Sequence, residues 1–76
     1  MMKVYFTFGS DPRYPYGRDQ YVVAEAETLH DAVQKFRHRH PDRTPGLVNC
    51  AFFYQENEFN KFRHLYDGAE PAEVIR

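Results

Sequence analysis

An amphipathic segment with clear ends, residues 28–40, most constrains how this chain can fold. Thr28 suits the N-cap of a helix, and Asp31 in the first turn suits its positive end. Apolar side chains recur at the spacing of one helix face, at Leu29, Ala32, Val33 and Phe36. Pro41 ends the helix, because the residue before a proline avoids helical angles. The segment therefore predicts a helix with one buried face.

Two strand-like segments precede this helix. Residues 3–8 are β-branched and aromatic, and residues 20–27 alternate in side-chain character. The turn-rich residues 9–19 join them, so together they predict an antiparallel hairpin. The first strand places three apolar side chains on one face, which we expect the helix to cover: Val4, Phe6 and Phe8.

A third strand and a second helix are expected after the first helix. Residues 47–54 are apolar almost without interruption, which is typical of a central strand covered on both faces. Residues 56–66 carry acids first and bases last, and Gly68 suits the end of that helix. Its apolar stripe is Phe59, Phe62 and Tyr66. The tail, residues 69–76, is expected either to fray or to dock late.

This order predicts a single small α+β domain over residues 1–76. A right-handed crossover places the third strand parallel to the second, with the first between them. The sheet is then three-stranded and mixed, in the order 2-1-3, with the first helix on one face. The second helix covers part of the opposite face or packs at an edge. Because an apolar run conflicts with an edge position, that helix or another chain should shield residues 47–54.

Charge and cysteine usage exclude several classes of protein. Ten basic and eleven acidic residues argue against a nucleic-acid binder driven by bulk charge. The single cysteine, Cys50, cannot form an intrachain disulfide, which fits a reducing compartment. No signal-peptide core or membrane-spanning run is visible. We therefore expect a cytoplasmic protein without membrane contact.

The long loop over residues 9–19 is the first candidate for function, because such loops are often functional. It interleaves guanidinium groups with rings, at Arg13, Tyr14, Tyr16 and Arg18. Tyrosine and arginine are common interface hot spots, and they also stack on single-stranded bases. We expect Tyr5 and Tyr21, on the sheet face away from the first helix, to extend this partner-binding surface. The structural alternative is that the loop tyrosines pack on their own domain.

A basic stretch at the end of the first helix is the second candidate. It contains Lys35, Arg37, Arg39 and Arg43, which would contact a phosphate or another anion. The structural alternative is a solvated helix face, because the helix dipole favours bases at this end. So few phosphate contacts would give weak, salt-sensitive binding to nucleic acid.

Neither metal binding nor catalysis is expected. His38 and His40 point about 160° apart on a helix, so they cannot share a metal ion. Cys50 lies within an apolar strand, where cysteine is usually a small core residue. No motif of a nucleophile elbow, a phosphate-binding loop or a zinc protease is present. We expect no cofactor and no enzymatic activity.

The chain is unusually rich in rings, with seven Phe and six Tyr. That content exceeds what so small an interior can hide. Exposed apolar patches usually mark interfaces, so the surplus predicts contact with another molecule. A symmetric homodimer is the simplest such contact.

The motifs Tyr5-Phe6-Thr7-Phe8-Gly9-Ser10-Asp11, Tyr14-Pro15-Tyr16 and Gly46-x3-Cys50-Ala51 resemble those of short proteins from phages, prophages and mobile elements. The resemblance implies an accessory protein that acts on a host component, as anti-CRISPR inhibitors do. The leading hypothesis is a non-catalytic binding protein that sterically occludes a protein or ribonucleoprotein partner. The alternatives are a small nucleic-acid-binding protein that uses the basic helix end, and a structural or regulatory homodimer.

Overall fold

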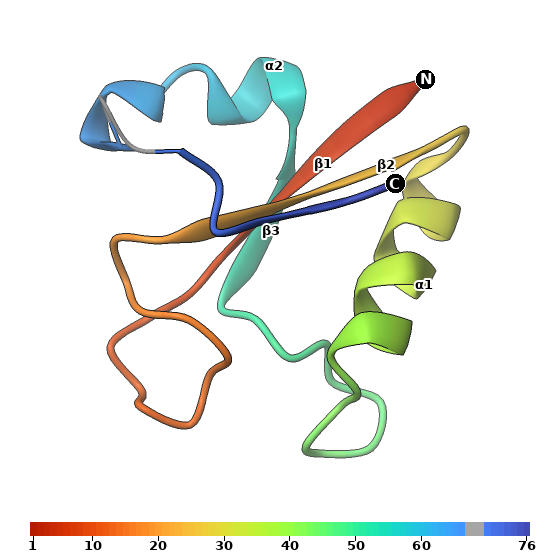
Figure 1. Cartoon of the computed structure of the whole chain (residues 1–76), viewed down its shortest axis with the longest axis vertical. Coiled ribbons are helices and arrows are strands. Elements are labelled where there is room, and N and C mark those ends of the chain that lie inside the picture. The colour runs from red at the N-terminus through yellow and green to blue at the C-terminus, as the bar shows by residue number, and fades with distance from the viewer. Residues whose placement is uncertain (67–69) are drawn as a thin grey trace.

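The computed structural model describes residues 1–66 and 70–76 and shows a four-stranded mixed sheet between helical layers (Figure 1). The elements are β1 (Met2–Thr7), β2 (Tyr21–Ala26), α1 (Leu29–Arg39), β3 (Phe52–Gln55), α2 (Glu56–Phe59), a 3₁₀ helix η1 (Arg63–Tyr66) and β4 (Glu73–Ile75). The strand order is β3-β1-β2-β4. β1 is antiparallel to β2 and β3, and β4 is parallel to β2. The predicted α+β class is confirmed.

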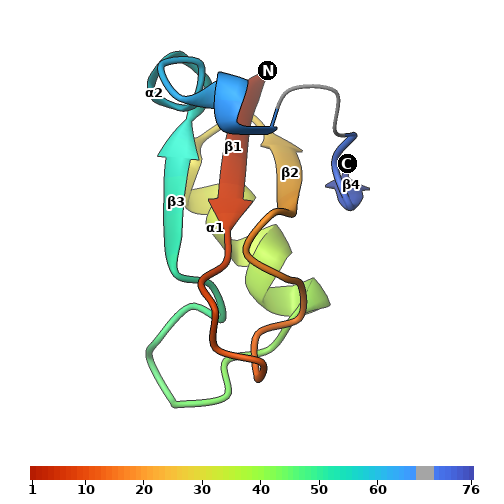
Figure 2. The same ribbon diagram turned by 90° about the vertical axis from the view of Figure 1, so that its left-hand side faces the viewer.

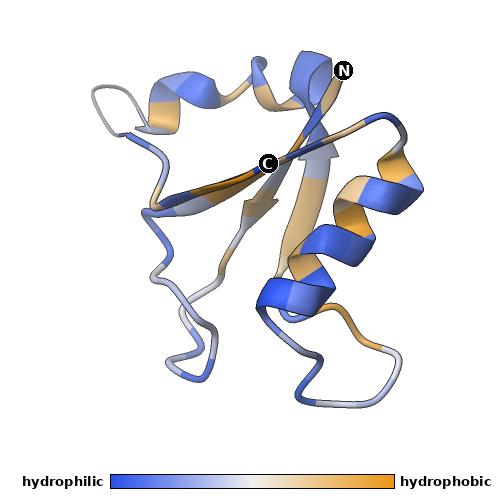
Figure 3. Cartoon of the chain, turned by 45° about the vertical axis from the view of Figure 1, so that its right-hand side comes forward, coloured by the Kyte–Doolittle hydropathy of each residue, from blue (hydrophilic) through white to orange (hydrophobic). Residues whose placement is uncertain are grey.

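The hairpin and α1 form as the local sequence predicts. β1 pairs with β2 so that Phe6 lies opposite Val22. Thr28 caps α1, since its hydroxyl accepts from the amide of Asp31 at 3.1 Å. Phe36 of α1 is fully buried, and its ring stacks on Phe6 with centroids 4.1 Å apart. Figure 3 shows the apolar segments of α1 turned towards the sheet. This face holds the larger hydrophobic cluster of the molecule.

The opposite face of the sheet is covered by α2 and η1. The predicted single helix over 56–66 is wrong in detail, because α2 ends at Phe59 and η1 begins only at Arg63. Phe59 is fully buried, and its ring stacks on Tyr5 with centroids 4.4 Å apart. Tyr21 and Val23 complete this second cluster. Gly68, the expected helix end, lies outside the described residues.

The segment before β3 departs most from the prediction. The apolar run predicted a strand over residues 47–54 that is covered on both faces, but β3 spans only four residues and two of its rings are exposed. Its place at an edge, next to β1, agrees with the predicted order 2-1-3. A tight turn brings the amide of Leu47 within 3.0 Å of the Thr44 carbonyl, with Gly46 at a φ of 85°. The amide of Cys50 is also used locally, at 2.8 Å from the Val48 carbonyl. These local bonds delay the strand until Phe52.

The tail forms a fourth strand, which corrects the expectation of three strands and, of the two alternatives for the tail, agrees with docking rather than fraying. β4 pairs with β2 so that Val74 lies opposite Val23. The amide of Ala72 donates to the Tyr21 carbonyl at 2.8 Å. Ile75 packs against the cluster under α1. In the described part of the chain, no helix has the length and apolar character needed to cross a membrane.

Candidate functional site: an open strand edge beside a groove

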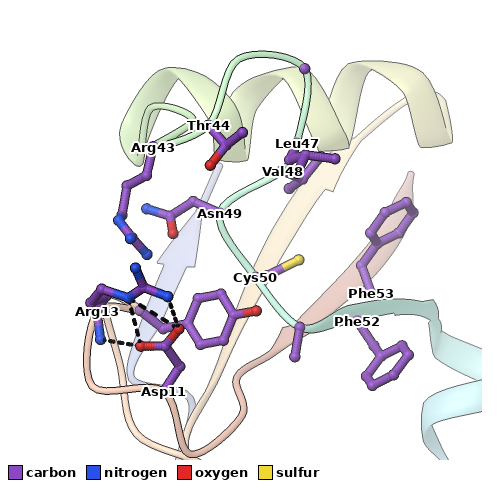
Figure 4. Close-up of a pocket in the computed structure, with 13 residues that line it drawn as sticks. Asp11, Arg13, Arg43, Thr44, Leu47, Val48, Asn49, Cys50, Phe52 and Phe53 are labelled. Carbon is purple, nitrogen blue, oxygen red and sulfur yellow. Dashed lines mark hydrogen bonds and ion pairs between the residues drawn. The ribbon is translucent and has the colours of Figure 1, made fainter.

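A groove of about 650 Å³ lies between the loop after β1 and the segment that leads into β3 (Figure 4). The sequence brings these walls together because β1 and β3 are neighbours in the sheet. The groove has a polar end and an apolar end. Its main lining residues are Arg13, Arg43, Asn49, Leu47, Phe52 and Phe53.

The polar end is built around an ion pair within the loop. Arg13 binds the Asp11 carboxylate with Nε at 3.1 Å from Oδ1 and Nη2 at 2.9 Å from Oδ2. Hydrogen bonds from Arg13 lower the pKa of Asp11 to about 2, so this pair stays charged. Figure 4 shows Arg43 and Asn49 extending towards it from the opposite wall. Two guanidinium groups and one carboxylate leave this end with one excess positive charge.

The apolar end is the start of β3. The exposed fractions of Phe52 and Phe53 are 65% and 41%, and that of Leu47 is 63%. Phe53 tilts against Phe6, 5.7 Å between centroids, on the α1 side of the sheet. Phe52 lies near Tyr54, 6.3 Å between centroids, and Figure 4 shows it on the other side of β3. The strand thus presents a ring on each face.

The other Phe and Tyr side chains, all within the described residues, are buried or half-buried. The expected aromatic surplus therefore shrinks to the two rings of β3. Figure 3 shows apolar residues before β3 as well, in the loop that follows α1. The exposed apolar residues of this region thus lie along the edge strand β3 and the loop before it.

The two outer edges of the sheet differ in their protection. Natural edge strands are usually blunted by brevity, charge, proline or a covering segment. β4 has only three residues, begins with Glu73 and is followed by Arg76. β3 reads Phe-Phe-Tyr-Gln, without a charge or a proline, and no described strand pairs with its outer edge. It is the edge that is open to another strand.

The predicted loop contacts divide between the surface and the interior. Arg13 lies in the groove, and Arg18 is exposed. Tyr14 and Tyr16 are half-buried against Phe8, with centroids 6.2 and 5.6 Å away. Packing on their own domain, the structural alternative, is thus confirmed for both tyrosines.

The prediction that Tyr5 and Tyr21 face a partner is wrong. Their exposed fractions are 2% and 4%, because α2 and η1 cover them. The guanidinium of Arg63 lies over the Tyr5 ring and donates to its hydroxyl at 3.1 Å. Burial raises the pKa of Tyr5, against the lowering effect of Arg63. Both tyrosines therefore belong to the core.

The predicted anion site at the end of α1 is largely satisfied internally. Lys35 donates to the Glu25 carbonyl at 2.8 Å. Arg37 pairs with Asp42, and Arg39 pairs with Glu73. Arg43 has no ion pair within residues 1–66 and 70–76. Phosphate binding by all four bases would therefore require breaking these contacts.

Glu73 organises a polar cluster that sequence reasoning missed. His40 Nε2 lies 2.7 Å from Glu73 Oε1, and the Tyr16 hydroxyl donates to the same oxygen at 3.3 Å. Arg39 pairs with the other oxygen. Burial would raise the pKa of Glu73, but the bonds from His40 and Arg39 outweigh it and hold the pKa below 4.5. No local pattern marks this cluster, because its members come from three distant segments.

Cys50 and the acidic and histidine side chains are the groups to consider for chemistry at this site. Burial raises the pKa of the half-buried Cys50 thiol to about 12, so the thiolate nucleophile is scarce. No group of three or more His, Cys, Asp or Glu side chains among the described residues could hold a metal ion. The described residues of the site offer apolar contact, unpaired backbone at a strand edge and one excess positive charge.

Comparison of the chain with protein-family models, with curated proteins and with solved structures gave no match. The resemblance to phage and mobile-element proteins therefore stays a prediction. The geometry of the groove and of β3 is what bears on function.

Proposed function

We propose that the chain is a non-catalytic protein-binding module that docks an extended segment of its partner on the open edge of β3. The unprotected aromatic edge carries this proposal. Strand addition supplies affinity through backbone hydrogen bonds and specificity through side-chain pockets on alternate positions. Exposed rings at the centre of such a contact are typical energetic hot spots.

The adjoining groove supports the same reading. It continues from Phe52 and Phe53 to the Arg13–Asp11 pair, so one docked segment would meet apolar and then polar surface. A partner held there has its own surface covered by this domain. The sequence resembles inhibitors that act on a host component. We propose that this domain inhibits its partner in the same way, by covering the surface of the docked segment.

The nucleic-acid alternative receives less support than protein binding. Three of the four bases proposed for phosphate contact already have acceptors in the fold. Stacking on bases needs exposed rings, and the loop tyrosines are packed on Phe8. The remaining exposed rings lie on an uncharged strand instead.

Affinity capture from the native host, with mass spectrometry of the retained proteins, tests this function. We expect Phe52→Lys to lower the recovery of the specific partner by about tenfold or more, because it places a charge on the docking edge. Leu65→Lys is the matched control, since Leu65 is 72% exposed but lies on η1. Both variants should keep the wild-type thermal midpoint. Equal recovery by the wild type and Phe52→Lys would contradict the proposal.

A further inference from the structure

We infer that the groove between the loop after β1 and the segment before β3 binds a small carboxylate ligand with an apolar body. The carboxylate lies at Arg43, and the apolar body lies along Leu47 and Phe53. The groove volume of about 650 Å³ falls within the roughly 300–1,000 Å³ that is typical of small-molecule sites. The inference goes beyond the proposed function, because it needs neither a protein partner nor pairing with the edge of β3.

The charge of the groove favours an anion at its polar end. Figure 2 shows the loop after β1 and the loop after α1 at the same end of the sheet. The charged side chains that line the groove come from these two loops: Asp11, Arg13 and Arg43. Arg13 is paired with Asp11, and Asp42 is paired with Arg37, so these four charges cancel. Arg43 has no ion pair in the described ranges 1–66 and 70–76, so it supplies the excess positive charge.

The remainder of the groove offers apolar surface that is open to solvent. Leu47 and Phe53 are exposed, and Val48 and Cys50 are half-buried in the same wall. An apolar body placed along this wall removes that surface from water, which an inorganic anion cannot do. The groove therefore matches a ligand that carries a negative charge at one end and apolar groups at the other.

The backbone of the wall before β3 favours a small ligand over an added strand. The amide of Leu47 donates to the Thr44 carbonyl at 3.0 Å, and that of Cys50 donates to the Val48 carbonyl at 2.8 Å. The amide of Ala51 donates to a carbonyl of the loop end of β1 at 2.9 Å. A peptide in the groove would lack these amides as partners for its own backbone. Recognition in the groove therefore depends on side chains.

NMR titration of the backbone amides of the full chain tests the inference. The probe is hydrocinnamate, and the comparison is hydrocinnamamide, which has the same size and shape but no charge. We expect a dissociation constant on the order of 10⁻³ M for the carboxylate, as ligand size and an open site dictate. The amide should bind about fivefold more weakly, because it lacks the charge that pairs with Arg43. Acetate, which lacks the ring, should bind at least about tenfold more weakly.

Two variants locate the two ends of the ligand. Arg43→Gln should weaken binding of the carboxylate about fivefold and leave binding of the amide unchanged, so that both probes bind alike. Leu47→Ser should weaken binding of both probes about threefold, because both carry the ring. Lys61→Gln is the matched control for the loss of a positive charge, since Lys61 is exposed but lies outside the groove. All three positions are exposed, so the thermal midpoints should stay near that of the wild type.

Several outcomes would overturn the inference. The wild type alone provides two of them: equal binding of the carboxylate and the amide, and no binding of the carboxylate at about ten times the expected dissociation constant. Carboxylate binding that Arg43→Gln leaves unchanged, or that Lys61→Gln weakens as much, would be a third. Probe binding and capture of a protein partner are separate measurements, so this inference and the proposed function can fail independently.

Discussion

Glu73 links the loop after β1, the end of α1 and β4 through single hydrogen bonds and ion pairs. Its side chain is only 13% exposed, so those partners replace water around the carboxylate. We expect Glu73→Gln to lower the free energy of unfolding at pH 7 by about 1–2 kcal/mol, the usual cost of weakening charge-assisted hydrogen bonds. Urea denaturation of the variant and the wild type measures this difference.

The same substitution predicts a dependence on pH. The pKa of Glu73 lies below 4.5 in the folded chain, so its stabilising effect is present above that value and is lost as the pH falls through the folded pKa. The difference in unfolding free energy between the wild type and Glu73→Gln should therefore shrink between pH 6 and pH 3. A difference that stays constant over this range would show that the carboxylate charge contributes nothing.

Cys50 offers a second test at the residue scale. Burial raises the pKa of its thiol from 9.0 to about 12, which lowers the thiolate fraction at pH 8 by roughly a thousandfold. A thiol-specific reagent should therefore modify the folded chain far more slowly than the chain in denaturant. Because the chain has one cysteine, the reaction needs no assignment. Equal rates in both states would mean that Cys50 is a reactive surface thiol.

At the scale of elements, local signals predicted the hairpin and α1 well. The alternating side chains of the two strands and the cap of α1 at Thr28 involve only residues close together in the sequence. Little tertiary information is therefore needed to predict these elements. β4 could not be predicted from its three residues, because its pairing with β2 is a contact between distant segments. In the site, Arg13 was identified, whereas the run 47–54 was read as buried. The apolar character of a strand does not show whether both of its faces are covered in the sheet. The turn at Gly46 determines where β3 begins.

The segment of α2 and η1 packs on the sheet through Phe59, with the half-buried Phe62 and Tyr66 beside it. Phe59 is fully buried between Tyr5 and Tyr21, whereas Leu65 of η1 is exposed. We expect Phe59→Ala to cost about 3–5 kcal/mol of stability, because it removes a fully buried ring that packs on Tyr5 and Tyr21. Leu65→Ala should stay within about 0.5 kcal/mol of the wild type. Chemical denaturation of both variants measures this, and similar costs would contradict the packing described.

The Phe59 substitution is severe relative to the whole domain. Small domains have about 0.05–0.15 kcal/mol of stability per residue, or about 4–11 kcal/mol for a chain of this length. Phe59→Ala therefore removes a large share of the total. If the variant retains β1–β2 pairing by hydrogen exchange but exposes Tyr5, the cluster under α1 is stable without the second helical layer.

At the scale of the whole molecule, charge is balanced both in total and locally. The net charge is −1, and the bases at the end of α1 are matched by Asp42 and Glu73. Binding of nucleic acid without sequence preference needs several free bases that release counterions from phosphates. The fold leaves Arg43 as the main unpaired base of that stretch, in the part of the chain that the structure describes.

We therefore expect single-stranded DNA to bind with a dissociation constant above about 10⁻⁴ M at 150 mM salt. The affinity is then lower than that of ordinary non-specific binders. A mobility-shift titration at 50 and 150 mM salt measures this, with Asp42→Asn as the comparison because it frees Arg37 from its ion pair. The variant should bind more tightly than the wild type at low salt, and the gain should vanish at higher salt. Tight, salt-sensitive binding by the wild type would instead mean that the ion pairs open to phosphate, and the basic helix end would then replace β3 as the leading contact surface.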